Sequence, residues 1–113
     1  MLAKNHRLHQ EKDIKRLVKT GKTFFLPQFT IKYLKNKQKD TRIGLVVSAR
    51  VDKRAVVRNK LSRRLREASR ELLPRLSEGY DIIIICKKSA LDLKYQEVKK
   101  QLEFAFSKIK ILS

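Results

Sequence analysis

The chain has 113 residues, a length that suits one domain with a single modest core and is too short for two. Its 29 lysine and arginine residues outnumber the 11 aspartate and glutamate residues, which gives a formal charge of +18. A compact domain tolerates that charge poorly unless a polyanion neutralises it, so we expect a nucleic-acid partner. No apolar run is long enough to span a membrane and no signal peptide opens the sequence, which argues against a membrane partner and predicts a cytoplasmic protein.

The chain opens with a basic segment and a short helix. Residues 1–9 contain few apolar side chains, which predicts a flexible arm with Leu8 as its anchor. From Gln10 to Thr20, apolar residues recur at the spacing of an amphipathic helix, and Gly21 follows at a position where glycine commonly ends a helix. A helix this short buries little surface alone, so its apolar side is expected to lie on a sheet.

Three β-prone segments follow the first helix. Residues 23–26 form the first, and Pro27 separates it from residues 29–34, either as two strands or as one bent edge strand. Apolar and polar side chains alternate in residues 29–34 and again in residues 42–49, after a loop of polar composition. The second and third segments are therefore expected to pair as an antiparallel hairpin.

Residues 52–75 predict one long helix that carries two stripes of opposite character. Asp52 is expected to cap its first turn, because a carboxylate accepts hydrogen bonds from the free amides there, and Pro74 marks its end. One side repeats apolar residues at the spacing of a helix that packs on a core. This side comprises Val57, Leu61, Leu65, Ala68 and Leu72.

The other side of the same helix is almost entirely basic. After Asp52, Glu67 and Glu71 are the only acidic residues in the segment, whereas a merely solvated helix usually alternates glutamate with lysine. The planar guanidinium group of arginine suits phosphate oxygens, so this side is predicted to bind a nucleic-acid backbone. It comprises Asn59, Arg63, Arg66 and Arg70, with Arg58, Lys60 and Arg64 at its flanks.

The last part of the sequence predicts a central strand and a terminal helix. Residues 82–85 are four consecutive isoleucines, the pattern of a strand that is covered on both faces. Apolar residues recur at helical spacing from Tyr95 to Leu112. The order of elements is α, β, β, β, α, β, α, in a single α+β domain over residues 1–113. The phenylalanines are assigned to the core by default, namely Phe24, Phe25, Phe29, Phe104 and Phe106.

No protein-only active site or metal site can be assembled from the remaining residues. Cys86 is the single cysteine and follows the isoleucine run, where a thiol behaves as a small buried hydrophobe. His6 and His9 stand three apart, but no second cluster of cysteine, histidine or paired carboxylates completes a metal cage or an acid–base pair. The polypeptide is therefore expected to hold no metal ion and no catalytic residue.

Residues 58–67 read Arg-Asn-Lys-Leu-Ser-Arg-Arg-Leu-Arg-Glu, and this run resembles the Arg-Asn-Arg motif helix of the bacterial ribonuclease P protein component. Lys60 keeps the charge of one motif arginine without its bidentate fork, and Ser62 removes one cation of the motif. The resemblance extends over nearly the whole chain through RIGLVVS before the motif, YDIIIICKKSA after it, and Leu8, Asp13 and Gly21.

The resemblance implies a fold and a function. The fold is the αβββαβα sandwich of that family, with a left-handed βαβ crossover through the motif helix. The function is that of the protein subunit of the endoribonuclease ribonuclease P, whose RNA, with bound Mg²⁺, removes the 5′ leader from precursor tRNA. The polypeptide would then bind the catalytic RNA and precursor tRNA, without catalysing cleavage alone, and no DNA partner is expected.

The resemblance also assigns site residues. In the family, the motif helix faces the catalytic RNA, a role that passes here to Arg58, Asn59, Lys60, Arg63 and Arg66. A cleft between the first helix and the sheet holds the single-stranded leader in family members, and its lining maps to Ile14, Val18, Lys32 and Ser48, with Tyr33 adjacent. Ile14 and Val18 stand where the family commonly has aromatic residues, which leaves apolar packing or shape for that helix instead of base stacking.

Two other functions remain open from the residues alone. A structural RNA-binding protein, such as a ribosomal constituent, would have the same composition and would leave precursor cleavage by the catalytic RNA unchanged. A protein nuclease would cleave RNA in Mg²⁺ without an RNA partner, and His6 and His9 are its only candidate residues. A tRNA-processing assay discriminates among the three functions.

Overall fold

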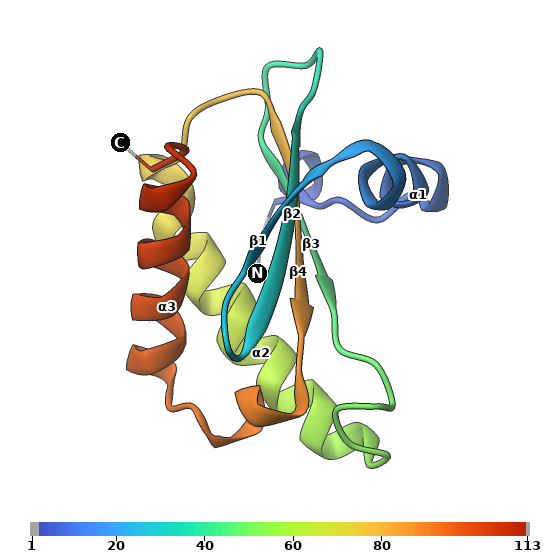
Figure 1. The fold of residues 1–113 in the computed structure, drawn as a ribbon, viewed down its shortest axis with the longest axis vertical. Helices are drawn as coiled ribbons and strands as arrows, with labels where there is room; N and C mark the ends of the chain where they lie inside the picture. Colours follow the sequence, from blue (N-terminus) through green and yellow to red (C-terminus); the bar gives the residue numbers. More distant parts are fainter. Residues whose placement is uncertain (1–2, 113) are drawn as a thin grey trace.

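Helices cover both faces of one four-stranded sheet in the computed structural model, which describes residues 3–112 (Figure 1). The elements confirm the predicted order, with short 3-10 turns added. They are η1 (Lys4–His6), α1 (Glu11–Thr20), β1 (Lys22–Phe25), β2 (Phe29–Lys35), β3 (Arg42–Val46), α2 (Ala55–Leu72), η2 (Leu73–Arg75), β4 (Tyr80–Cys86), η3 (Lys88–Asp92) and α3 (Tyr95–Lys108). Within residues 3–112, none of these helices is both long and apolar enough to cross a membrane.

The strand order is β1-β2-β4-β3, which places β4 in the interior of the sheet as predicted. The predicted hairpin between residues 29–34 and 42–49 is wrong, because β4 lies between those two strands. Instead, β1 pairs with β2 and β2 with β4, both antiparallel, while β3 pairs with β4 in parallel. Side chains of Ile82, Ile83 and Ile84 are completely buried, and only an interior strand with both faces covered can bury them all.

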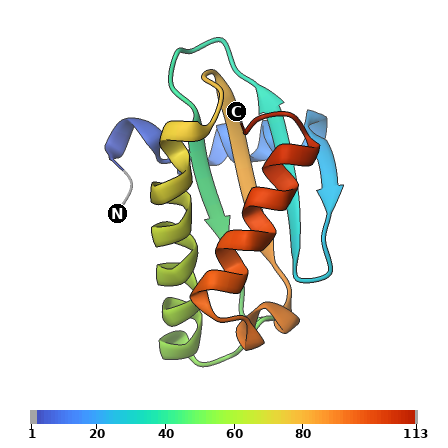
Figure 2. The ribbon, with the colours of Figure 1, turned by 90° about the vertical axis from the view of Figure 1, so that its left-hand side faces the viewer.

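The connection from β3 through α2 to β4 is left-handed. In Figure 2, α2 lies in front of the sheet, β3 runs downward with β4 parallel to it, and β4 lies to the right of β3. A right-handed crossover would place β4 on the other side of β3. The structure therefore has the uncommon hand that the family resemblance implied, against the strong general preference for right-handed crossovers.

Helices α2 and α3 pack on one face of the sheet (Figure 1). The predicted apolar stripe of α2 is buried there except for Val57, which is partly exposed. Leu61, Leu65 and Leu72 have no exposed surface, and they share one core with Ile82 and Ile84 of β4. Truncation of such a leucine to alanine typically costs about 2–5 kcal/mol, so this stripe holds α2 in place. Its opposite side is thereby turned away from the sheet.

Helix α1 packs on the other face of the sheet. Leu17 lies against Ile83, which alternates with the isoleucines that face α2. Gly21 ends α1 as expected and is its C-cap residue, with a φ of −74°. Glycine is needed there because the chain makes a close approach. A Cβ atom at this position would lie 2.5 Å from the carbonyl oxygen of Leu17.

The N-terminal segment lies along the outer edge of β3. The amide of Leu8 donates a 3.0 Å hydrogen bond to the carbonyl of Ile43, and the buried Leu8 side chain confirms its predicted role as an anchor. Gly44 permits this contact, because a Cβ atom there would lie 2.7 Å from the Leu8 carbonyl oxygen. Met1 and Leu2 of the predicted arm fall outside the described residues, and the flexibility of the arm stays a prediction.

Helix α2 begins later than predicted. Its N-cap is Arg54, so Asp52 is not the cap, although its carboxylate accepts a 2.8 Å hydrogen bond from the Arg54 amide. The Asp52 carboxylate also accepts from the Arg54 guanidinium, which lowers the pKa of Asp52 to about 2. Asp52 thus stabilises the turn that precedes α2. At the other end, Pro74 lies in η2, just beyond the last residue of α2.

Two phenylalanines depart from their predicted core positions. Phe25 is 72% exposed and Phe104 is 52% exposed, whereas Phe29 and Phe106 are fully buried. Successive side chains of β1 point to opposite faces of the sheet. Phe24 packs against Phe104, with ring centroids 6.5 Å apart, so Phe25 points to the face that carries α1.

A buried ionic cluster joins α1, β3 and β4. The Asp81 carboxylate is 1% exposed and accepts two hydrogen bonds from Arg42, at 2.9 Å from Nε and 2.7 Å from Nη2. Asn36 donates to the same carboxylate at 2.9 Å, and Arg42 also donates to Asp13 of α1 at 3.2 Å. The hydrogen bond with Asp81 raises the pKa of Arg42. These contacts bring together residues that lie far apart in the sequence.

Replacement of Asp81 by alanine should lower the free energy of unfolding by about 3–5 kcal/mol, because Arg42 is left buried without its main partner. Chemical denaturation measures the change. The control is Glu11→Ala, which removes an exposed pair with Lys15 and should cost less than about 0.5 kcal/mol. Equally small effects of the two changes would contradict a structural role for Asp81.

Cys86 should react with a thiol reagent only after unfolding. Burial raises the pKa of the Cys86 thiol to about 12, so almost none of the reactive thiolate exists near neutral pH. We expect slow labelling of the native protein at about pH 8 and rapid labelling in denaturant, measured with a chromogenic disulfide. Rapid labelling without denaturant would show that the end of β4 is open to solvent.

Candidate nucleic-acid interface

The outer side of α2 is a basic surface along the helix. Its 18 residues span about 27 Å at the rise of an α-helix. Asn59, Lys60, Arg63 and Arg70 are exposed on this side, which the buried leucine stripe turns away from the core. The structure therefore brings these predicted residues into one row, and a row of cations at this spacing can follow a phosphate backbone.

The flanks of α2 are partly engaged with neighbouring groups. Arg64 points toward α3 and donates a 3.3 Å hydrogen bond to the carbonyl of Leu93. Arg70 donates to Glu67 at 2.8 Å, which raises the pKa of Arg70 and lowers that of Glu67. Glu71 accepts from Lys99 of α3 at 2.7 Å. The acidic residues of α2 thus lie toward its C-terminal end, and its first half carries no acidic side chain.

Arg58 does not lie at a flank of the basic side as predicted. It stands seven residues before the buried Leu65, so the two share nearly the same direction on the helix. Its side chain is half-buried, and its Nε atom is buried without a hydrogen-bond partner in the described part of the chain. Arg58 is therefore held by packing at the start of α2, separate from the exposed row.

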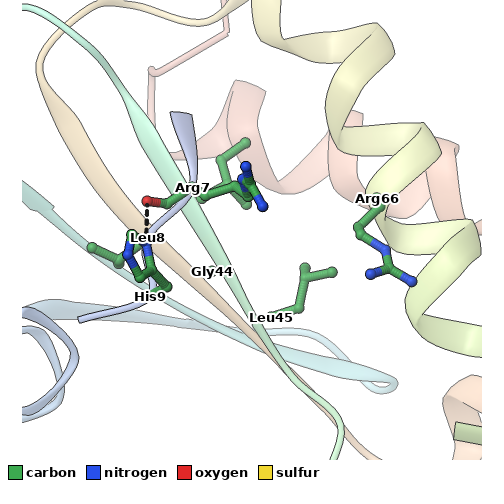
Figure 3. A pocket seen from close by; sticks show the side chains of 7 residues that line it. Arg7, Leu8, His9, Gly44, Leu45 and Arg66 are labelled. Carbon is green, nitrogen blue, oxygen red and sulfur yellow. Dashed lines mark hydrogen bonds between the residues drawn. The ribbon is translucent and has the colours of Figure 1, made fainter. Parts of the chain in front are cut away.

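Arg66 extends the basic surface from α2 to the N-terminal segment. Figure 3 shows Arg66 and Arg7 on the two sides of Leu45, above the edge of β3. His9 lines the same pocket, and its Nδ1 atom donates a 3.3 Å hydrogen bond to the Arg7 carbonyl. The sequence indicated a basic arm but not its location, because Gly44 and Leu8 dock the arm only in the tertiary structure.

The sheet face that carries α1 contains the predicted cleft residues. Figure 1 shows α1 against one end of this face, while no helix of the described chain covers the other end. Val18 is 48% exposed at the margin of α1, and Ile14 is half-buried beside the core. Lys32 projects from β2 on this face and donates a 3.0 Å hydrogen bond to Thr23.

Ser48 lies at the uncovered end of this face, just beyond β3. It lines a hollow with Val46, Ile85 and Arg50, and its hydroxyl accepts a 3.3 Å hydrogen bond from the Arg50 amide. Polar and cationic side chains from Ser48, Arg50 and two lysines therefore line the hollow together with the apolar side chains of Val46 and Ile85. The structure places Ile14, Val18, Lys32 and Ser48 on a single face of the sheet.

Tyr33 is not brought together with the other cleft residues. It alternates with Lys32 along β2 and so points to the opposite face, where it packs against the core beneath α2 and α3. Its pocket is lined by Lys22, Tyr80 and Ile109. Tyr33 therefore has no direct access to the face that carries α1.

The two histidines bind separate carbonyl groups. His6 Nδ1 donates a 2.7 Å hydrogen bond to the Thr41 carbonyl, while His9 Nδ1 donates to Arg7. Within residues 3–112, no three histidine, cysteine, aspartate or glutamate side chains lie close enough together to hold a metal ion. The chemistry that this surface offers is the binding of anions.

Comparison of sequences gives a consistent set of relatives. The family model described as Ribonuclease P matches residues 2–110 of the chain. A ribonuclease P protein component from Picosynechococcus sp. is 36% identical over 102 residues, which cover 90% of this chain and 88% of that protein. One from Bacillus cereus is 35% identical over 108 residues, covering 95% of this chain and 93% of that protein.

Solved structures agree with the sequence relatives. The RNase P protein from Staphylococcus aureus matches with a TM-score of 0.86 at 28% identity, covering 96% of this chain and 98% of that chain. An S. aureus mutant described as defective in mRNA degradation activity matches with a TM-score of 0.87 at 29% identity, covering 96% and 92%. The protein from Thermotoga maritima gives 0.78 at 28% identity, covering 88% and 94%.

Arg63→Ala should weaken binding to a ribonuclease P RNA and reduce the slope of log affinity against log salt by about 0.7–0.9, the loss of one phosphate contact. Filter binding over a salt series measures both quantities. Lys100→Ala is the matched control, because Lys100 is an exposed lysine beside Phe104 of α3 and outside the basic row. Wild-type affinity and slope for the Arg63 variant would contradict the role of α2.

Proposed function

The chain belongs to the ribonuclease P protein family, and from this membership we propose that it binds the catalytic RNA through α2 and the 5′ leader of precursor tRNA through the open sheet face. The family match over residues 2–110 makes it a bacterial-type component of ribonuclease P, with a role in tRNA processing. The observation that carries the finer proposal is the presence of two cationic surfaces on different sides of one small domain.

Electrostatics supports a bridging role between two RNA molecules. A catalytic RNA and a precursor tRNA repel each other, and a protein of charge +18 placed between them lowers that repulsion. Helix α2 and the face that carries α1 lie on opposite sides of the sheet (Figure 1). Each surface can therefore contact a different RNA at the same time, and each phosphate neutralised releases condensed counterions.

Catalysis is assigned to the RNA subunit with its Mg²⁺ ions. Mg²⁺ prefers oxygen ligands such as carboxylates, whereas the two surfaces of this chain present mainly arginine, lysine and hydroxyl groups. The residues therefore do not fit a Mg²⁺ site on the protein. We assign to the polypeptide the positioning of substrate and of RNA phosphates, within the cytoplasm where tRNA precursors are processed.

A protein that cleaves RNA alone is the second candidate function. It is favoured by the description of the similar S. aureus mutant as defective in mRNA degradation. In this chain, His6 and His9 would have to supply the chemistry, and each is already bonded to a main-chain carbonyl in a different place. An assay of precursor tRNA cleavage, with and without the catalytic RNA, separates the two functions.

The deciding measurement is cleavage of a precursor tRNA at low Mg²⁺, with bacterial ribonuclease P RNA present or absent and this protein added or withheld. We expect cleavage only with the RNA, at a rate that the protein increases, because a cationic bridge raises substrate affinity. Cleavage by the protein alone that His6→Ala and His9→Ala abolish would establish the nuclease. RNA binding without any stimulation would indicate a structural RNA-binding protein.

A further inference from the structure

Phe25 is a large apolar side chain that the fold leaves in water. It is 72% exposed near the end of β1, and it points to the face that carries α1, because the neighbouring Phe24 packs against α3. The register aligns Phe25 with Thr30 of β2, then with Ile85 of β4 and Val46 of β3. Phe25 therefore stands at one end of a row that crosses the uncovered part of the sheet.

Two lysines are hydrogen-bonded to residues close to Phe25 in the chain. Lys32 lies in the next row of the same face and is held by its 3.0 Å hydrogen bond to Thr23, which is two residues before Phe25. Lys87 follows β4 and donates a 2.9 Å hydrogen bond to the carbonyl of Leu26, the residue directly after Phe25. Each ammonium group is thus bonded to a residue within two positions of Phe25, one in β1 and one in the turn that follows it.

An exposed aromatic ring, with two lysines bonded to residues beside it in the chain, suits an unpaired nucleotide. The base can stack on the ring while the lysines contact the phosphates on either side, which is how single-stranded nucleic acid is bound without sequence preference. We propose that Phe25 is the stacking platform for one unpaired base of the 5′ leader, with Lys32 and Lys87 holding the flanking phosphates. This inference rests on the proposed function, because it assigns a contact within the leader surface, which is the open sheet face that we propose binds the 5′ leader.

The same exposed ring at an edge strand could instead meet a second copy of the chain. Charge opposes that arrangement, since two molecules of charge +18 repel each other. Lys32 and Lys87 of one copy would also approach the positively charged surface of the other copy. A ligand that carries phosphates gains from the same lysines. Charge complementarity therefore favours RNA over self-association, and the sedimentation of the free protein is measured alongside its affinity for RNA.

The test uses holoenzyme reconstituted with a ribonuclease P RNA and two substrates, one with a long 5′ leader and one with a leader of a single nucleotide. The affinity for the long-leader substrate divided by the affinity for the single-nucleotide substrate measures the contribution of the leader to binding. Phe25→Ala should lower that ratio by roughly 5- to 150-fold, the effect of losing one base–aromatic stack. Phe25→Tyr should retain the ratio and Phe25→Leu should lose most of it, because the ring and not its apolar area is required.

Four comparisons distinguish the possible outcomes. Phe104→Ala removes another exposed aromatic side chain and should leave the ratio unchanged. If Phe25→Ala keeps the wild-type ratio while Lys32→Ala lowers it, the stacking inference is overturned and the leader surface stands. If the wild-type ratio is itself near one, both the leader surface and the stacking inference are overturned. A change in sedimentation with an unchanged ratio would assign Phe25 to self-association instead.

Discussion

The structure depends on one carboxylate that water does not reach. Asp81 at the start of β4 is hydrogen-bonded to Arg42 at the start of β3, and Arg42 in turn binds Asp13 of α1. A buried charge is tolerated only when it is paired and hydrogen-bonded, so these partners must be adjacent in the folded protein. That requirement places β3 beside β4 and α1 over the same end of the sheet.

Once β3 and β4 are neighbours in parallel, the chain between them must cross one face of the sheet, and α2 is that connection. Its leucine stripe packs on Ile82 and Ile84, which turns the arginines outward. Because α1 covers only part of the opposite face, a second surface remains open there (Figure 1). One central strand thus separates two cationic surfaces, an arrangement that suits a protein between two RNA molecules.

Local periodicity predicted much of this protein correctly, and its errors have identifiable causes. The apolar stripe of α2 was confirmed except at Val57, and the predicted burial of residues 82–85 was confirmed except at Ile85, because each pattern reports its own element. Arg58 was assigned to a flank of the basic side, although its spacing of seven residues from Leu65 already places it beside the apolar stripe. Phe25 was assigned to the core because its exposure depends on which side of β1 meets α3.

The sequence by itself determined the order of elements, the single domain and the basic character of α2, since these follow from spacing and charge within short segments. Only the tertiary structure decided that β4 separates β2 from β3 and that the N-terminal arm joins the pocket of Arg66. These outcomes depend on pairings such as Arg42 with Asp81, 39 residues apart. The energy of such a pairing exists only when both partners are present, so neither local segment reveals it.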